Sequence, residues 1–234
     1  MKSPLLLAST AVGMVVLVAA SGIVFARCEN RTALNRAYAL MDDADRFQMN
    51  RSTLDDALSF VKKHHGEARS SKPTGGCAPT DCMAEAETIP LFYSRHTWLI
   101  PVVKQVGVHV FNCNVTVWIK DGKLVAVEKI FFVPKAVGAD VYVATVVSDP
   151  DERISRNPSY KLHPAFITNY REGRGTPEFT YWSNASSAER TVPSTRMNLD
   201  CVATLAGCKS VAQILPAAWG QHQADASRIE SLEK

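Results

Sequence analysis

The most constraining feature of the sequence is an uncharged apolar run near its start. Residues 4–26 read PLLLASTAVGMVVLVAASGIVFA and contain no charged side chain. At about 1.5 Å per helical residue this run reaches roughly 34 Å, which is enough to cross a hydrocarbon layer of about 30 Å. The run therefore predicts a membrane-spanning helix, and we expect residues 1–27 to form a membrane anchor or signal segment.

A cleaved signal peptide is the alternative interpretation of the same run. Lys2 supplies a short basic start, and Val24 and Ala26 form a small-residue site before Arg27. The run is longer than the apolar stretch of about 7 to 15 residues that is usual in signal peptides, which favours an uncleaved, single-pass anchor. Cleavage near Ala26 would instead release a secreted chain.

Two signals disagree about the side of the membrane on which the rest of the chain lies. Arg27, Arg31 and Arg36 follow the apolar run, which favours a cytoplasmic domain on the positive-inside rule. Six cysteines in 234 residues, four of them in close pairs, are typical of an oxidising compartment. Acidic side chains lie among the arginines and weaken the first signal, so we expect an extracytoplasmic domain.

The close cysteine pairs are Cys77 with Cys82 and Cys201 with Cys208. Their spacing differs from the C-x-x-C of redox-active pairs and from the pairs of zinc sites, so we expect no metal and no cofactor. A turn at Pro79 can bring the first pair within the Cα separation of about 4.4 to 6.8 Å that a disulfide needs. We predict a structural disulfide within each pair, although six cysteines also allow cross-pairing with Cys113.

Two amphipathic helices are predicted in residues 28–65. The first continues the apolar segment, with apolar side chains at three- and four-residue steps, and the second is expected to begin at a capping box formed by Ser52 and Asp55. The expected buried positions are Leu34, Tyr38, Met41, Ala44 and Phe47 in the first helix and Leu54, Ala57, Leu58 and Val61 in the second.

Residues 66–215 are expected to form an α+β domain that contains the disulfides. Residues 66–80 have the composition of a loop, and two β-branched runs joined at Asp121 and Gly122 predict a hairpin. Residues 139–147 and 177–184 extend it to an antiparallel meander of three or four strands. The core-facing positions predicted in the first strand of the hairpin are Phe111, Cys113, Val115, Val117 and Ile119. Residues 216–234 are expected to be a polar tail.

The net charge and the short motifs of the sequence limit the classes of function that we expect. The net charge of +3 includes no clustered basic face, so no nucleic-acid partner is expected. No short catalytic motif was found, and no catalytic residue is predicted. We therefore expect a non-catalytic binding or assembly module that contacts the membrane through residues 4–26 and takes a protein partner.

Residues 148–176 are expected to form a long loop, and loops longer than about 12 to 15 residues are usually functional or disordered. Its aromatic and basic side chains are the expected partner-binding groups: Tyr160, His163, Tyr170, Arg171 and Arg174. An alternative hypothesis is an exported enzyme whose site lies on this loop.

A hydrophobic helix that continues into a soluble helix and then a meander resembles the layout of pilins and pseudopilins. The resemblance implies a structural subunit of a surface filament. This chain departs from it, because the charged leader, the glycine processing site and the glutamate near the start of the apolar segment are missing.

Overall fold

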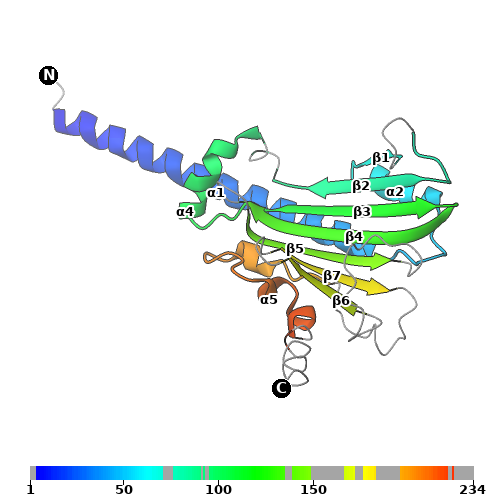
Figure 1. Ribbon diagram of the computed structural model, residues 1–234. Coiled ribbons are helices and arrows are strands. Elements are labelled where there is room, and N and C mark those ends of the chain that lie inside the picture. The colour runs from blue at the N-terminus through cyan, green and yellow to red at the C-terminus, as the bar shows by residue number, and fades with distance from the viewer. Residues whose placement is uncertain are drawn as a thin grey trace, which may run out of the picture.

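The structure is a computed structural model. It describes residues 4–70, 76–90, 92, 95–134, 139–148, 166–171, 176–182, 196–220 and 223. The α+β class predicted from the sequence is confirmed: a long N-terminal helix and a few short helices accompany one β-sheet (Figure 1).

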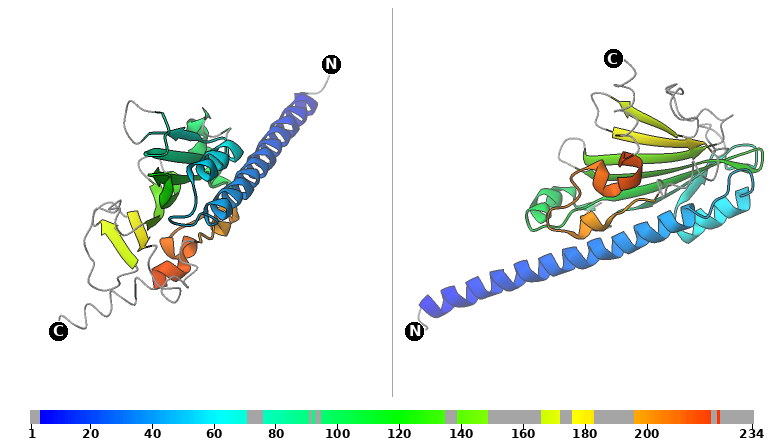
Figure 2. Two further views of the ribbon diagram at one scale, coloured as in Figure 1. Left: turned by 90° about the vertical axis from the view of Figure 1, so that its right-hand side faces the viewer. Right: turned by 90° about the horizontal axis from the view of Figure 1, so that it is seen from below.

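Helix α1 (Pro4–Ala44) is continuous from the apolar run into the folded domain, as the sequence predicted. Its C-terminal part lies along one face of the sheet, and its N-terminal part extends beyond the end of the sheet (Figure 2). Every third or fourth residue of the packed part is buried, which is the expected pattern for one face of a helix. The buried residues are Ala33, Leu34, Ala37, Leu40, Met41 and Ala44.

Helix α2 (Leu54–Lys63) packs beside α1 and corrects two sequence predictions. Its N-cap is Thr53, whose backbone N–H donates to Asp56 Oδ2 at 2.8 Å, so the capping box is one residue later than predicted. Phe60 is buried, whereas Leu58 is 38% exposed. The buried face of α2 therefore follows Ala57, Phe60 and Val61, and Leu58 lies at its exposed edge.

The sheet has seven strands in the order β1-β2-β3-β4-β5-β7-β6. Strands β1 to β5 pair antiparallel with their neighbours, β7 pairs parallel with β5, and β6 pairs antiparallel with β7. The strands are β1 (Glu67–Arg69), β2 (Cys82–Thr88), β3 (Asn112–Lys120), β4 (Lys123–Pro134), β5 (Ala139–Ser148), β6 (Phe166–Arg171) and β7 (Thr176–Trp182).

The prediction of three or four strands was therefore too low. β1 lies entirely within residues 66–80, the segment predicted as a loop, and it is only three residues long. β2 alternates alanine with glutamate, residues that are depleted in strands generally. β6 lies inside the 148–176 segment that was predicted to be loop throughout.

The predicted hairpin joins β3 and β4. Asp121 and Gly122 form its turn with φ values of 50° and 78°, a left-handed conformation that suits a two-residue hairpin loop. The predicted core face of β3 is confirmed, because Phe111, Cys113, Val115, Val117 and Ile119 are all at most 2% exposed.

Short helices lie near the end of the domain where α1 leaves it. η1 (Thr97–Leu99) and α4 (Ile100–Gln105) lie where α1 leaves the sheet, and η2 (Asp200–Ala203) lies along α1 (Figures 1 and 2). The last described element is α5 (Val211–Ile214). Ala218 is buried and Trp219 packs against the core, so the packed chain includes the first residues of the segment predicted as a tail.

Candidate functional site

The residues predicted to bind a partner are only partly described. Tyr160, His163 and Arg174 lie outside the described residues. Tyr170 and Arg171 belong to β6, opposite Pro177 and Thr176 of β7. Two of the five residues therefore sit on a paired strand, and their grouping into one binding surface stays a prediction.

Both predicted cysteine pairs are bonded. Cys77 and Cys82 have Cα atoms 4.6 Å apart, and Cys201 and Cys208 have Cα atoms 4.9 Å apart. Cys28 is a free, exposed thiol on α1. The cross-pairing left open by the sequence is excluded for Cys113, which is a free thiol in the core.

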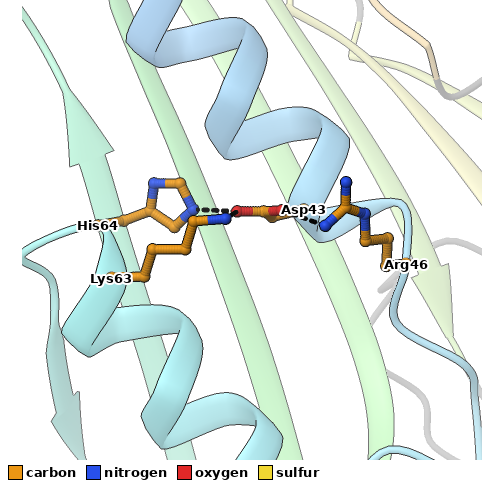
Figure 3. Close-up of polar contacts among 4 residues, drawn as sticks. All are labelled: Asp43, Arg46, Lys63 and His64. Atoms are coloured by element: carbon orange, nitrogen blue, oxygen red, sulfur yellow. Dashed lines mark hydrogen bonds and ion pairs between the residues drawn. The ribbon is translucent and has the colours of Figure 1, made fainter.

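The most concentrated group of charges described lies between the ends of α1 and α2 (Figure 3). Asp43 Oδ2 accepts from Lys63 Nζ at 2.5 Å and contacts His64 Nε2 at 2.8 Å. Asp43 Oδ1 contacts the Arg46 guanidinium at 3.0 Å. We call these four residues the Asp43 cluster.

The electrostatics of the cluster favour an ionised carboxylate. Partial burial alone would raise the pKa of Asp43, but the hydrogen bonds and positive charge of Lys63 and His64 outweigh it and lower the pKa below the ordinary value of 3.8. The Asp43 and His64 side chains are only 13% and 11% exposed, whereas Lys63 is 62% exposed. The cluster thus links two helices through a largely buried Asp43–His64 pair, and the Arg46 and Lys63 side chains lie toward solvent.

Two members of the cluster, Lys63 and His64, line a cleft of about 880 Å³, which we call the α2 cleft. Its walls carry both signs of charge, with Arg36 and Lys63 opposed to carboxylates at the start of β1 and along β2. Two of those carboxylates, Glu85 and Glu87, accept hydrogen bonds from side-chain amides on β3. Glu85 also pairs with Arg69 at 3.0 Å.

Hydrogen bonding limits the chemistry that the Asp43 cluster can do. An Asp–His pair can orient a general base, but only when the other ring nitrogen faces a hydroxyl, a thiol or a water. Within the described part of the chain, Asp43 is the hydrogen-bond partner of the His64 side chain. The His64 ring also lies against Phe60, 5.0 Å between ring centroids. These contacts fix His64 between the helices.

The described residues also include no group of three or more His, Cys, Asp or Glu side chains that could hold a metal ion. The α2 cleft is lined by side chains of both charges.

A second ion pair ties the end of α1 to the sheet. Lys129 lies on the core face of β4 with only 2% of its side chain exposed, and its Nζ is bonded to Asp45 Oδ1, one residue beyond α1. Burial raises the pKa of the nearby Cys113 thiol to about 12, so this thiol stays protonated at neutral pH. Lys129 and Cys113 therefore belong to the core.

Sequence reasoning missed the Asp43 cluster and the α2 cleft. Asp43 and His64 are 21 residues apart on different helices, so no short spacing links them. The available signal was the pair of adjacent charge runs MDDADR and VKKHHGE, one at the end of each predicted helix. The first run is acidic and the second is basic. If the two helices pack side by side with these ends together, the opposite charges predict an ion pair between them.

Comparisons with protein-family models, with curated protein sequences and with solved structures give no match to this chain. The proposal for its function therefore depends on the geometry of the chain itself.

Proposed function

We propose that the protein is a single-pass, membrane-anchored extracytoplasmic domain that works as a non-catalytic binding or assembly module. One observation carries the proposal: a single helix is both a candidate membrane span and part of the domain core. In the described part of the chain, the helical segment Gly13–Ala44 is long and apolar enough to cross a membrane. Its residues from Met14 to Val18 are 62% to 69% exposed, which is unfavourable for such a run in water.

The two disulfides support the extracytoplasmic side. Structural disulfides persist in oxidising compartments and are rare in the cytosol. Each closes a short loop, of five or seven residues' separation, which joins elements of the same domain. In a reducing compartment both disulfides would be reduced, and neither loop would be closed covalently.

Alkylation of freshly lysed native cells tests the compartment. Under denaturing conditions without reduction, we expect two thiols to label, Cys28 and Cys113, and six to label after reduction. Full labelling of Cys77 and Cys82 without reduction would contradict the extracytoplasmic assignment. Extraction at alkaline pH tests the anchor, because a chain with a cleaved N-terminal segment would appear in the soluble fraction.

The α2 cleft is the surface that we propose for the partner. Its fixed, mixed charges suit a charged polypeptide, and both helices that wall it belong to the rigid core. We expect the protein solubilised in mild detergent to migrate on native gels as a complex larger than one 25.6 kDa chain with its bound detergent. Arg36→Glu, in the cleft, should dissociate this complex, whereas Lys62→Glu, on the same domain but outside the cleft, should not.

Migration of the unaltered protein as a monomer would contradict an assembly role. Equal loss of the complex in both variants would place the contact elsewhere on the surface.

A further inference from the structure

We propose that a second cleft, at the end of the domain where α1 leaves it, binds the headgroup of a phospholipid that carries hydrogen-bond donors beside its phosphodiester. This inference rests on the proposed membrane anchoring by α1. We call this site the membrane-end cleft. It has a volume of about 640 Å³ and lies between α1, the residues that follow α4, and η2.

The position of the cleft along α1 is the first argument. The apolar run ends at Ala26, and Arg27, Asn30 and Arg31 all line the cleft. At about 1.5 Å per residue, Arg27 to Arg31 covers about 6 Å of the helix axis. The polar layer on each side of a bilayer is about 5 to 8 Å thick, so these residues lie at the level of the headgroups when the apolar run spans the hydrocarbon core.

The two arginines of the cleft are the second argument, since the one acid in its lining, Asp200, accepts a hydrogen bond from the Tyr38 hydroxyl. Arg27 and Arg31 are one helical turn apart on the same wall, and both are exposed. One N–H of Arg27 points to the carbonyl of Val106 at 3.4 Å, which holds that side chain over the cleft. Arginine is the side chain best suited to bind a phosphodiester, because its planar fork of donors matches the two free oxygens.

Asn30 indicates the kind of headgroup. Its side chain is only 6% exposed, and its Oδ1 has no hydrogen-bond partner in the described part of the chain. A buried acceptor without a partner is unfavourable, and a bound donor would relieve this. The ammonium of phosphatidylethanolamine and the hydroxyls of phosphatidylglycerol are such donors, whereas phosphatidylcholine has none.

The surface around the cleft is apolar where the bilayer would meet it. Trp98 and Val102, on η1 and α4, are 70% and 55% exposed, and Leu205, which lines the cleft, is 73% exposed. η1 and α4 are held to α1 through Ala26, which packs with Val108 and Val110. Exposed tryptophan is characteristic of the membrane–water interface, and a surface leucine there can contact the acyl chains.

Native mass spectrometry of the full chain in detergent tests the proposal. Added phosphatidylethanolamine or phosphatidylglycerol should form a one-to-one complex, and phosphatidylcholine should bind at least about tenfold more weakly because Asn30 gains no donor from it. Arg31→Gln should weaken binding of the first two lipids about tenfold by removing a charge-assisted hydrogen bond. Arg51→Gln, which changes an exposed arginine in the turn before α2, is the matched control and should bind as the unaltered chain does.

Other outcomes overturn the proposal in distinguishable ways. Equal binding of the three lipids, or equal loss in Arg31→Gln and Arg51→Gln, would mean nonspecific attraction. Competition by glycerophosphoethanolamine, which lacks acyl chains, as strong as that by the lipid would identify a site for a soluble phosphodiester. Failure of the chain to float with liposomes would refute the anchor itself, whereas flotation without selective binding would refute only the headgroup site.

Discussion

Two glycines decide how the Cys201–Cys208 loop packs. Gly207 has a φ of +67°, and a Cβ there would lie 2.6 Å from Cε1 and Nδ1 of the His109 ring. His109 Nε2 in turn bonds the carbonyl of Leu205 at 3.0 Å. Gly107, with a φ of +75°, approaches Leu205 in the same way. The loop can therefore reach His109 only because position 207 has no side chain.

Gly207→Ala should lower the free energy of unfolding by about 1 to 3 kcal/mol, because the new Cβ meets both backbone strain and the His109 ring. Denaturant unfolding of the detergent-solubilised chain measures the change. Gly220→Ala is the control, since a Cβ at that position would have no other atom within 4 Å and its φ is not positive. If both variants have equal stability, the close packing of Gly207 on His109 is refuted.

Tyr38 joins α1 to η2 through its hydroxyl. This group donates to Asp200 Oδ1 at 2.8 Å and accepts from the backbone N–H of Leu199 at 2.9 Å. Burial, followed by the hydrogen bond to Asp200, raises the pKa of Tyr38 from 10.0 to about 12. The protonated form is therefore the one that the fold stabilises.

Because the pKa of Tyr38 is raised on folding, its contribution is complete below pH 10 and is lost as the pH rises toward 12. Tyr38→Phe should lower the free energy of unfolding by about 1 kcal/mol at neutral pH. The difference between the two proteins should shrink above pH 10. A difference that stays constant between pH 8 and pH 12 would contradict this role.

Burial could be predicted from the sequence more accurately than the hydrogen-bond partners of polar side chains. Alternation placed the core face of β3 correctly from Phe111 to Ile119, because a strand has a fixed two-residue period. Proximity and turn residues also identified both disulfides. The partners of Tyr38 and Asp43 come from distant positions, and only the packing of helices and sheet brings them together.

At the scale of elements, the Asp43 cluster fixes α2 against α1. The Asp43 carboxylate contacts Arg46 just after its own helix, and Lys63 and His64 at the end of the neighbouring helix. Lysine and histidine at the end of α2 also lie where a helix dipole favours positive charge. The cluster therefore adds to the apolar contact of Phe60 and Val61 with the core.

Asp43→Ala should lower the free energy of unfolding by about 1 to 3 kcal/mol at neutral pH, because Arg46, Lys63 and His64 lose their shared acceptor. The pKa of Asp43 is lowered on folding, so its contribution is complete above pH 4 and is lost as the pH falls below the ordinary value of 3.8. The two proteins should converge in stability under these acidic conditions. Asp42→Ala, one residue earlier and exposed, is the control and should change stability little at any pH.

Elements were predicted where periodicity was strong and missed where it was weak. The hairpin was found because two long β-branched runs flank a left-handed turn. β2 was missed because its side chains are alanine and glutamate, yet its register places Ala84 opposite Val117 within the core. Its position is determined by pairing with β3 and by coverage from α1, which are long-range effects.

At the scale of the molecule, the Cys77–Cys82 bond is expected to fasten a local turn. Replacing both residues by serine should lower the free energy of unfolding by about 1 to 3 kcal/mol, because a short closed loop constrains the unfolded chain little. The β2–β3 pairing that follows Cys82 should persist, so circular dichroism should be unchanged. Loss of the folded state on this substitution would show that the bond organises the sheet.

Because α1 runs without a break from its free apolar end into the core, the domain has no hinge at its base. The helix is about 60 Å long, and its packed half is held by the sheet and α2. If the apolar end tilts, the helix and the sheet therefore rotate together by the same angle. Bilayer thickness, which sets the tilt of a spanning helix, would then set the angle and the height at which the domain meets a neighbouring molecule.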